Sequence, residues 1–531
     1  MMLNKFRSAT FLIVLLLISV PFVFAYYYPG EGYTFGGFFI NPLDGNTYLA
    51  KMYQGWQGAW KITLPYTAEP GEGAYLFLYY LFLGHVSRLL NLPIPSTFHA
   101  ARIINAILLL LALNRFYSTI FIQRRTAYLA FILATLGSGI GWIASLVGYL
   151  SVDMWVAEGY PFLASFTSAH FPLAIAIMVF LLTPRTTLLF NLRPLSILAY
   201  SALGFILATI SPFSLILVAI ISAGQAIWEW LPVKFSWFPA NKVDENSITP
   251  DSHPLRNLQW VAWTVIGGFP VVAYQLWISR VHPVLSIWNQ QNLTPTPPAW
   301  DLIIALSPTL LLAGVGSWFS VKRRNPADRL LLTWAGTSLV LMYIPTSLQL
   351  RFMIGLFVPL AGLAAWGIEC LAGASQRKYR NLVAALFIFS LPTILFLLLV
   401  AFTSVKLHHP LMYLTQGEAK ALSWIKSNTP QDTLILAAPE TGLYIPAHTG
   451  RRVIYGHPFE TVQADKEREM VTQVFQSGWS DGDTRAFLNN RGVDYIFYGP
   501  RERSLGTNDY IHGLKVVYRG DGVTIYAVED R

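Results

Sequence analysis

The chain has 531 residues, of which 54% are hydrophobic and only 12% are charged, and its formal net charge is +9. Soluble domains carry about 25% charged residues, so this composition excludes an ordinary soluble protein and is typical of a membrane protein. Residues 1–405 hold 23 Lys and Arg against 13 Asp and Glu, and they carry the whole positive excess. Such an excess indicates loops beside anionic lipid. No stripe of basic and aromatic residues favours a nucleic acid as the partner.

The first apolar stretch that is able to cross a bilayer is Phe11–Phe24, extended by its flanking residues. Lys5 and Arg7 precede it, and residues 23–25 resemble a cleavage site, so a signal peptide is the alternative. Because many apolar stretches follow, we interpret the first as an uncleaved anchor. The further predicted spans are 98–121, 126–148, 168–183, 195–210, 213–231, 258–279, 300–320, 330–345, 352–372 and 382–405.

Residues 74–90 are apolar but short, and Gly84, His85 and Arg88 interrupt them. If this segment does not cross, 17 of the 23 basic residues of the first 405 fall on the same side as the N-terminus; if it crosses, only 6 do. Since basic loops stay in the cytoplasm, the first arrangement is favoured. We therefore predict an interfacial or re-entrant helix at 74–90, about 11 spans and a cytoplasmic N-terminus.

This orientation predicts a multi-span membrane domain over residues 1–405, with outer loops at 28–97, 149–167 and 280–299. Residues 406–531 then lie outside the membrane, and their pattern predicts a compact α/β domain. A helix is expected over Gly417–Asn428, with strands at Thr433–Ala438 and Asp494–Tyr498. Leu514–Tyr518 and Val523–Val528 read as a hairpin around the turn at 519–522. This domain shows no nucleotide-binding glycine loop and no nucleophile elbow, so we expect it to cover or shape a membrane site.

Asp44 is the most informative residue, because it follows the first span in the run NPLDGN at 41–46. A carboxylate beside a membrane fits a general base that takes a proton from an acceptor hydroxyl or amine. The alternative is a carboxylate that caps the following helix. The amphipathic, aromatic sequence at 48–56 suits a helix that lies at the interface.

The second outer loop contains Asp153 and Glu158, and His170 stands at the mouth of the next span. These side chains are candidates to orient an acceptor, or to hold a divalent cation through oxygen ligands, although no spacing is diagnostic of a metal site. An ordinary interfacial role is the alternative for each. Cys370 is the only cysteine, so the chain has neither a disulfide framework nor a cysteine metal site.

Arg351 starts a predicted span on the outer side, where arginine is disfavoured. A guanidinium there is able to grip a lipid phosphate with two hydrogen bonds, or else to reach the headgroups as a snorkelling side chain. Arg102 also lies on the predicted outer side, where arginine is disfavoured, and it is the weaker candidate of the two. Arg280 and His282, at the start of the third outer loop, are spare candidates. His457 either touches a substrate or is a loop histidine without a catalytic role, and the second alternative is favoured.

The order of these features resembles the GT-C membrane glycosyltransferases, which use polyprenyl-phosphate-linked sugars. The resemblance rests on Asp44 after span one, the segment Tyr75–Arg102, the Arg124-Arg125 turn and the acidic loop around Asp153. Protein O-mannosyltransferases, aminoarabinose transferase and oligosaccharyltransferases are similar in this arrangement, which covers about the first 200 residues.

The resemblance implies that Asp44 is the first-loop catalytic acid and that Asp153 or Glu158 is the second-loop acid. It also implies a polyprenyl-phosphate-linked sugar as donor, an acceptor of unspecified kind and an enzyme of the cell membrane. Gly45 follows Asp44 where a second acid is more usual, which weakens the case for a bound metal. No cofactor is required, and a divalent cation is left open. A transporter or flippase and a non-catalytic relative are the alternatives.

Overall fold

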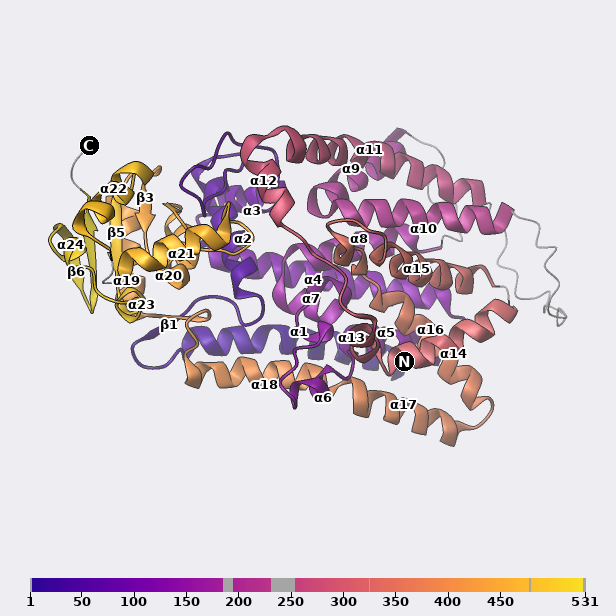
Figure 1. The fold of residues 1–531 in the computed structure, drawn as a ribbon. Coiled ribbons are helices and arrows are strands. Elements are labelled where there is room, and N and C mark those ends of the chain that lie inside the picture. Colours follow the sequence, from indigo (N-terminus) through magenta and orange to yellow (C-terminus); the bar gives the residue numbers. More distant parts are fainter. Residues whose placement is uncertain (1, 185–193, 231–253, 324, 477–478, 529–531) are drawn as a thin grey trace. The chain divides into compact units, whose positions relative to one another are not determined.

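The computed structural model describes residues 2–184, 194–230, 254–323, 325–476 and 479–528 (Figure 1). The chain divides into two compact units. Unit 1 comprises Met1–Val20, Ala101–Tyr274 and Thr294–Val400, and unit 2 comprises Pro21–Ala100, Gln275–Leu293 and Ala401–Arg531. Of the basic residues that favoured a cytoplasmic N-terminus, five lie outside the described residues: Arg185, Arg193, Lys234, Lys242 and Arg324.

Apolar helices, some long and some short, occupy the predicted spans. By length and composition, five helical stretches of the described residues are able to cross a membrane: α1 (Met2–Tyr27), α4 (Ile94–Ile120), α5 (Arg124–Leu136) with α6 (Gly141–Ser145), α11 (Pro254–Val281), and α17 (Gln376–Ser390) with α18 (Pro392–Leu407). Shorter helices occupy the other predicted spans: α8 (His170–Leu182), α9 (Pro194–Ile210), α10 (Pro212–Trp230), α15 (Pro326–Met342) and α16 (Phe357–Ala372). The polytopic helical fold is confirmed, while the number and direction of the crossings stay predictions.

The span predicted at 300–320 is broken. Helix α13 (Ala299–Leu306) and helix α14 (Thr309–Arg323) meet at an angle of 87°. Pro308 lies between them, and its ring both removes a backbone N–H and clashes with the preceding turn. Counted as one span, the pair raises the number of candidate crossings in the described residues to six.

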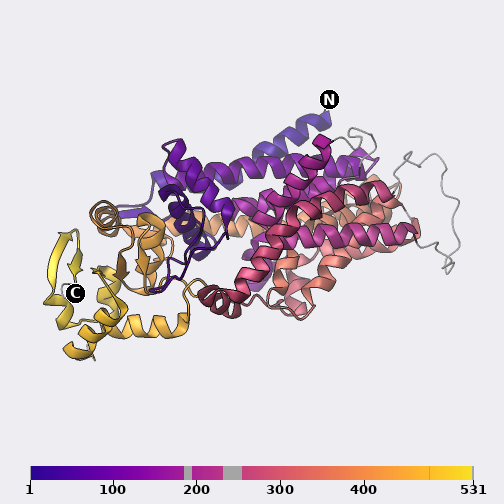
Figure 2. The same ribbon diagram turned by 90° about the horizontal axis from the view of Figure 1, so that it is seen from above.

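The remaining part of unit 1 is built from short elements between the apolar helices. Helices α9, α10 and α15 pack side by side, as do α14 and α16 (Figure 2). The segment around Asp153 and Glu158 folds into short helical turns, and another such turn precedes α16. These elements are η1 (Val152–Met154), η2 (Ala157–Gly159), α7 (Pro161–Thr167) and η4 (Gln349–Met353).

In unit 2 the ambiguous segment at 74–90 forms helix α3 (Leu78–Leu89), which packs along helix α2 (Pro42–Gln57). Its 12 residues rise about 18 Å, against about 30 Å for the hydrocarbon core of a bilayer. A Cβ atom on Gly84 would lie 2.0 Å from the carbonyl oxygen of Met52, and one on Gly55 would lie 2.1 Å from that of Leu81. The two helices therefore need glycine where they touch, because their backbones are in direct contact.

The predicted C-terminal α/β domain is confirmed. Helix α19 begins at a capping box formed by Thr415 and Glu418. The sheet has the order β4-β3-β5-β7-β6, in which β3 is parallel to β4 and β5, and β7 is antiparallel to β5 and β6. Its strands are β3 (Leu434–Leu436), β4 (Arg452–Val453), β5 (Tyr495–Tyr498), β6 (Lys515–Gly520) and β7 (Val523–Ala527). The helices are α19 (Gln416–Asn428), α20 (Pro439–Thr449), α21 (Ala464–Phe475), α22 (Asp481–Arg491), α23 (Pro500–Leu505) and α24 (Asp509–His512).

Alternate residues of each strand enter different hydrophobic clusters, as the two-residue period of a strand requires. In β3, Ile435 packs in one cluster, while Leu434 and Leu436 pack in the other. The first of these clusters also contains Ala50 of α2 and Tyr66, which belong to the first outer loop. Strand β1 (Tyr33–Phe35) of the same loop pairs antiparallel with β2 (Tyr413–Thr415). The loop that carries Asp44 is therefore built into the core of unit 2, where α12 (Pro283–Gln291) also lies.

Candidate functional site

Asp44 lies in the first turn of α2, with Pro42 at the start of the helix. Asn41 precedes the helix in a left-handed conformation, with φ at 51°. The N-terminal end of a helix carries a partial positive charge, which stabilises a carboxylate there. The Asp44 side chain is 52% exposed, so this carboxylate is accessible to solvent. The predicted capping role is not seen, because no side-chain hydrogen bond caps α2; instead, the Thr47 hydroxyl donates to the Asp44 carbonyl at 2.9 Å.

His457 faces Asp44 from the loop after β4. Its ring is buried, and its Nε2 atom lies 3.8 Å from Oδ1 of Asp44. The other ring nitrogen, Nδ1, accepts hydrogen bonds from the backbone N–H groups of Phe459 and Glu460 at 3.0 and 3.1 Å. Burial lowers the pKa of His457 below its ordinary value, so the ring is neutral at pH 7. The sequence favoured a loop histidine over one that touches a substrate, because nothing local relates position 457 to position 44.

A buried ion pair lies beside this contact. Nζ of Lys51, two turns after Asp44 on α2, donates to a carboxylate oxygen of Glu460 at 2.7 Å. The ammonium also sits 3.7 Å from the centre of the Phe77 ring, an attractive cation–π geometry. A buried charge is tolerated only when it is paired in this way. Sequence reasoning missed Lys51 and Glu460. The seven-residue spacing of Asp44 and Lys51 on one helix face was the available signal.

Asp153, in unit 1, has a different environment. Its side chain is 1% exposed, and its Oδ2 accepts hydrogen bonds from the Ser138 hydroxyl and from the N–H groups of Gly139 and Gly141 at 3.3, 3.1 and 3.2 Å. Burial raises its pKa to about 6. A Cβ atom on Gly141 would lie 2.0 Å from Oδ1 of Asp153. Asp153 thus fastens the segment between α5 and α6, and its predicted catalytic role stays a prediction.

Glu158 and Arg351, predicted from segments 193 residues apart, are brought together in unit 1. Nη1 of Arg351 donates to a carboxylate oxygen of Glu158 at 2.9 Å. The Glu158 side chain is 7% exposed, whereas that of Arg351 is 37% exposed. The backbone of Glu158 also accepts from the N–H of Gly355 at 2.9 Å. Glu158 therefore holds one edge of a guanidinium whose side chain remains accessible.

Arg102 is buried in unit 1, where its Nη1 donates to the carbonyl oxygens of Ile18, Ser165 and Phe166 at 2.9, 2.9 and 3.2 Å. These contacts join three segments of the chain, which is the work of a structural arginine. His170 begins α8 and lies partly exposed, with its ring 3.9 Å from that of Phe171. The substrate-binding roles predicted for Arg102 and His170 stay predictions.

The spare candidates lie in unit 2. Nδ1 of His282 accepts from the N–H of Leu285 and caps α12, and its Nε2 lies 2.9 Å from the carbonyl oxygen of Glu72. Arg280 is exposed near the end of α11. Both ring nitrogens of His282 thus contact backbone groups, which gives this histidine a structural role.

No protein-family model matches the chain, and no curated protein matches its sequence. Solved structures do match. The archaeal oligosaccharyltransferase AglB from Archaeoglobus fulgidus, in complex with an inhibitory peptide and a dolichol-phosphate, is 13% identical with a TM-score of 0.52. That match covers 93% of this chain and 69% of AglB. ArnT from Cupriavidus metallidurans, bound to undecaprenyl phosphate, is 11% identical with a TM-score of 0.50 over 97% of both chains.

The chain has the GT-C fold. At these identities the likeness shows the fold alone, and this fold agrees with the one that the order of sequence features implied. The described residues of this GT-C chain contain no group of three or more His, Cys, Asp or Glu side chains that could hold a metal ion.

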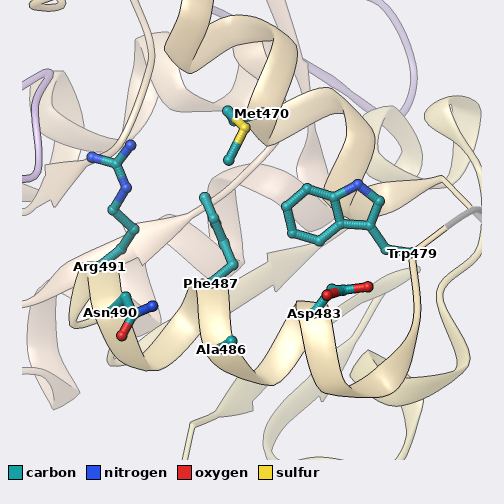
Figure 3. Close-up of a pocket in the computed structure, with 7 residues that line it drawn as sticks. All are labelled: Met470, Trp479, Asp483, Ala486, Phe487, Asn490 and Arg491. Carbon is teal, nitrogen blue, oxygen red and sulfur yellow. The ribbon is translucent and has the colours of Figure 1, made fainter.

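The GT-C chain also carries a pocket on the C-terminal domain, with a volume of about 400 Å³ (Figure 3). Helices α21 and α22 form it together with Trp479. Its charged groups are already engaged, because Arg491 pairs with Glu467 at 2.7 Å and Asp483 accepts from the Ser480 hydroxyl at 2.6 Å. The pocket contains none of the predicted site residues, and we assign it no role.

Proposed function

We propose that this chain is a glycosyltransferase that moves a sugar from a polyprenyl-phosphate donor to a hydroxyl or amine acceptor on the outer face of the membrane. Asp44 is the general base in this proposal, and Arg351 binds the phosphate of the donor. The GT-C fold supports the enzyme class. AglB and ArnT, which share this fold, were solved with polyprenyl phosphates, which supports the donor class.

The exposure of Asp44 is the observation that carries the assignment. Of the three acids that the sequence selected, Asp44 is 52% exposed, whereas Asp153 and Glu158 are both nearly inaccessible. A general base has to come within hydrogen-bond reach of the proton that it removes. Asp44 meets this requirement without any rearrangement of the protein.

The chemistry follows from the two substrates. The acceptor oxygen or nitrogen attacks the anomeric carbon, and Asp44 takes its proton as the new bond forms. The bond between the anomeric carbon and the phosphate oxygen breaks, and its electron pair leaves with the polyprenyl phosphate. A phosphate is a good leaving group, so no strong acid is required. Direct displacement inverts the anomeric configuration.

Arg351 supplies the positive charge that the departing phosphate needs. A guanidinium presents its N–H groups in a fork that matches two phosphate oxygens, and preorganised donors are most effective where charge develops. The ion pair with Glu158 restricts the rotation of the Arg351 side chain.

The broken span α13–α14 is the one observation that favours a transporter, since transporters place such breaks at their substrate sites. Those breaks carry polar or charged groups that bind the cargo. Here the break carries only the neutral hydroxyl groups of Ser307 and Thr309, and no charged residue lies between Ala305 and Leu310. Transfer activity, rather than transport, is therefore the better proposal. A non-catalytic relative would bind the donor without turnover.

The direct test uses the full-length protein in liposomes. Undecaprenyl phosphates that carry radiolabelled hexoses or pentoses serve as donors, and a cell-envelope extract serves as the acceptor. We expect radiolabel in the acceptor and release of undecaprenyl phosphate for at least one donor, and neither with Asp44→Asn. Movement of intact labelled donor between the leaflets without sugar transfer would instead support a flippase.

A further inference from the structure

We propose that His457 is a positioning residue for Asp44, and that it holds the base through a hydrogen bond donated from Nε2. This inference rests on the proposed function, because it concerns the base of that reaction. It gives the C-terminal domain a direct part in the chemistry, where the sequence suggested only a cover. The two residues are 413 positions apart in the chain, and unit 2 contains both of them.

The backbone determines which ring nitrogen carries the proton. Two N–H groups, those of Phe459 and Glu460, point at Nδ1 of His457. An atom that accepts two hydrogen bonds cannot itself carry a hydrogen, so Nδ1 is unprotonated. The neutral ring must then carry its proton on Nε2. This nitrogen is buried, and it has no hydrogen-bond partner within the described residues.

Asp44 supplies the missing partner. Its Oδ1 lies 3.8 Å from Nε2, which exceeds the 2.7–3.2 Å of a formed N–H···O bond. The exposed carboxylate is able to rotate and close this gap, and catalytic hydrogen bonds often tighten only when substrate binds. One carboxylate oxygen would then be fixed by His457, leaving the other directed at the acceptor.

The loop around His457 is held from several sides. The Thr461 hydroxyl accepts from the N–H groups of Gly456 and His457 at 3.4 and 3.3 Å. Glu460, three residues after His457, is anchored by Lys51 on α2. Asp44 therefore faces His457, and Lys51 on the same helix faces Glu460. The ion pair keeps the loop in register with the helix that carries the base.

The same geometry excludes His457 as the next carrier of the proton. Accepting a proton at Nδ1 would break two backbone hydrogen bonds, and Nε2 already carries one. Asp44 therefore passes its proton to solvent through its own exposed side. The charged or titratable groups that face His457 are Asp44, Glu460 and Lys51, with the Tyr66 ring 6.1 Å away. Of these, only Asp44 is exposed.

Two substitutions distinguish a positioning role of His457 from a purely structural role. His457→Asn keeps an oxygen near the place of Nδ1 to cap the 458–460 turn, but it has no donor that reaches Asp44. His457→Gln reaches Asp44 with an amide N–H, but it loses the cap. We expect His457→Asn to be the more stable variant and the less active one. Its kcat should fall about 10- to 100-fold, as for loss of a hydrogen bond to a charged group, while KM for the lipid donor stays unchanged.

The pH profile of kcat is the second readout. A hydrogen bond donated to a carboxylate lowers the pKa of that carboxylate, so its loss raises the pKa of the base. We expect the acidic limb of the profile to move to higher pH in His457→Asn and to stay near the wild-type position in His457→Gln.

Failure of this inference and failure of the proposed function give different results. If Asp44→Asn transfers sugar at the wild-type rate, the proposed function is wrong. If Asp44→Asn is inactive but His457→Asn keeps the wild-type kcat and acidic limb, only the positioning role is wrong. The positioning role would also be wrong if activity followed stability, so that His457→Asn was more active than His457→Gln.

Discussion

Asp44 and Asp153, the aspartates of the two acidic loops, differ in how far their side chains are exposed. Asp44, in unit 2, starts a helix with its carboxylate half exposed, and its histidine neighbour lies just beyond hydrogen-bond distance. Asp153, in unit 1, is buried and accepts three hydrogen bonds from the 138–141 segment. The first arrangement leaves oxygen lone pairs for a substrate. The second engages Oδ2 with the fold and buries Oδ1, so the two aspartates differ in how accessible they are to a substrate.

The substitution Asp44→Asn tests the role of the exposed aspartate and has the largest expected effect. The amide has nearly the same shape but cannot accept a proton, so we expect transfer to fall about 100-fold or more. The free energy of unfolding should change by less than about 0.5 kcal/mol, because the side chain is exposed. Transfer assays and thermal unfolding in detergent measure the two quantities. Asp44→Glu is the control that keeps the carboxylate and some activity; full activity of Asp44→Asn would end the base assignment.

For Asp153 we expect the reverse pattern. Asp153→Ala leaves three buried donors without their acceptor and should lower the free energy of unfolding by about 3 kcal/mol. Gly141→Ala should destabilise through the clash of its methyl group with the same carboxylate. Activity per folded molecule should stay near the wild-type level in both variants, as measured by transfer after removal of unfolded protein. A stable but inactive Asp153→Ala would make Asp153 a second catalytic acid.

Arg351→Lys tests the donor side of the reaction. Lysine keeps the charge but loses the two-pronged geometry, so KM for the polyprenyl-phosphate donor should rise about tenfold, with a smaller change in kcat. Arg280→Lys is a matched control, because Arg280 is also an exposed arginine predicted on the outer side. An unchanged KM for Arg351→Lys, or an equal rise in both variants, would leave Arg351 as a lipid-facing side chain.

The smallest expected effect is the pH dependence of stability. Since burial raises the pKa of Asp153 to about 6, the folded protein binds this proton more tightly than the unfolded chain. Stability from this group therefore increases as pH falls through 6, by about 1 kcal/mol between pH 7 and pH 5. Thermal unfolding should show this gain in the wild-type protein and not in Asp153→Asn. Equal pH profiles would mean that burial does not raise the pKa of Asp153.

The sequence by itself determined the local architecture. Apolar stretches of spanning length predicted the helices, because the length of an apolar run is a property of consecutive residues. Alternation and turn residues predicted the hairpin at 514–528 and the helix at 417–428 for the same reason. The exception is the break at Pro308, where a single residue divided one predicted span into two helices. The GT-C order of features was also visible, since it is an order along the chain.

Only the tertiary structure decided which polar residues are accessible and which are partners. Asp44 and Asp153 are both acids in outer-loop segments, and nothing local tells the exposed one from the buried one. His457 and Glu460 meet Asp44 and Lys51 only because the first outer loop packs into the core of unit 2, through Ala50 and through the pairing of β1 with β2. Burial and pairing depend on the contacts of the whole fold. Whether a carboxylate is a candidate base or stabilises the fold depends on neighbours that lie far away in the sequence.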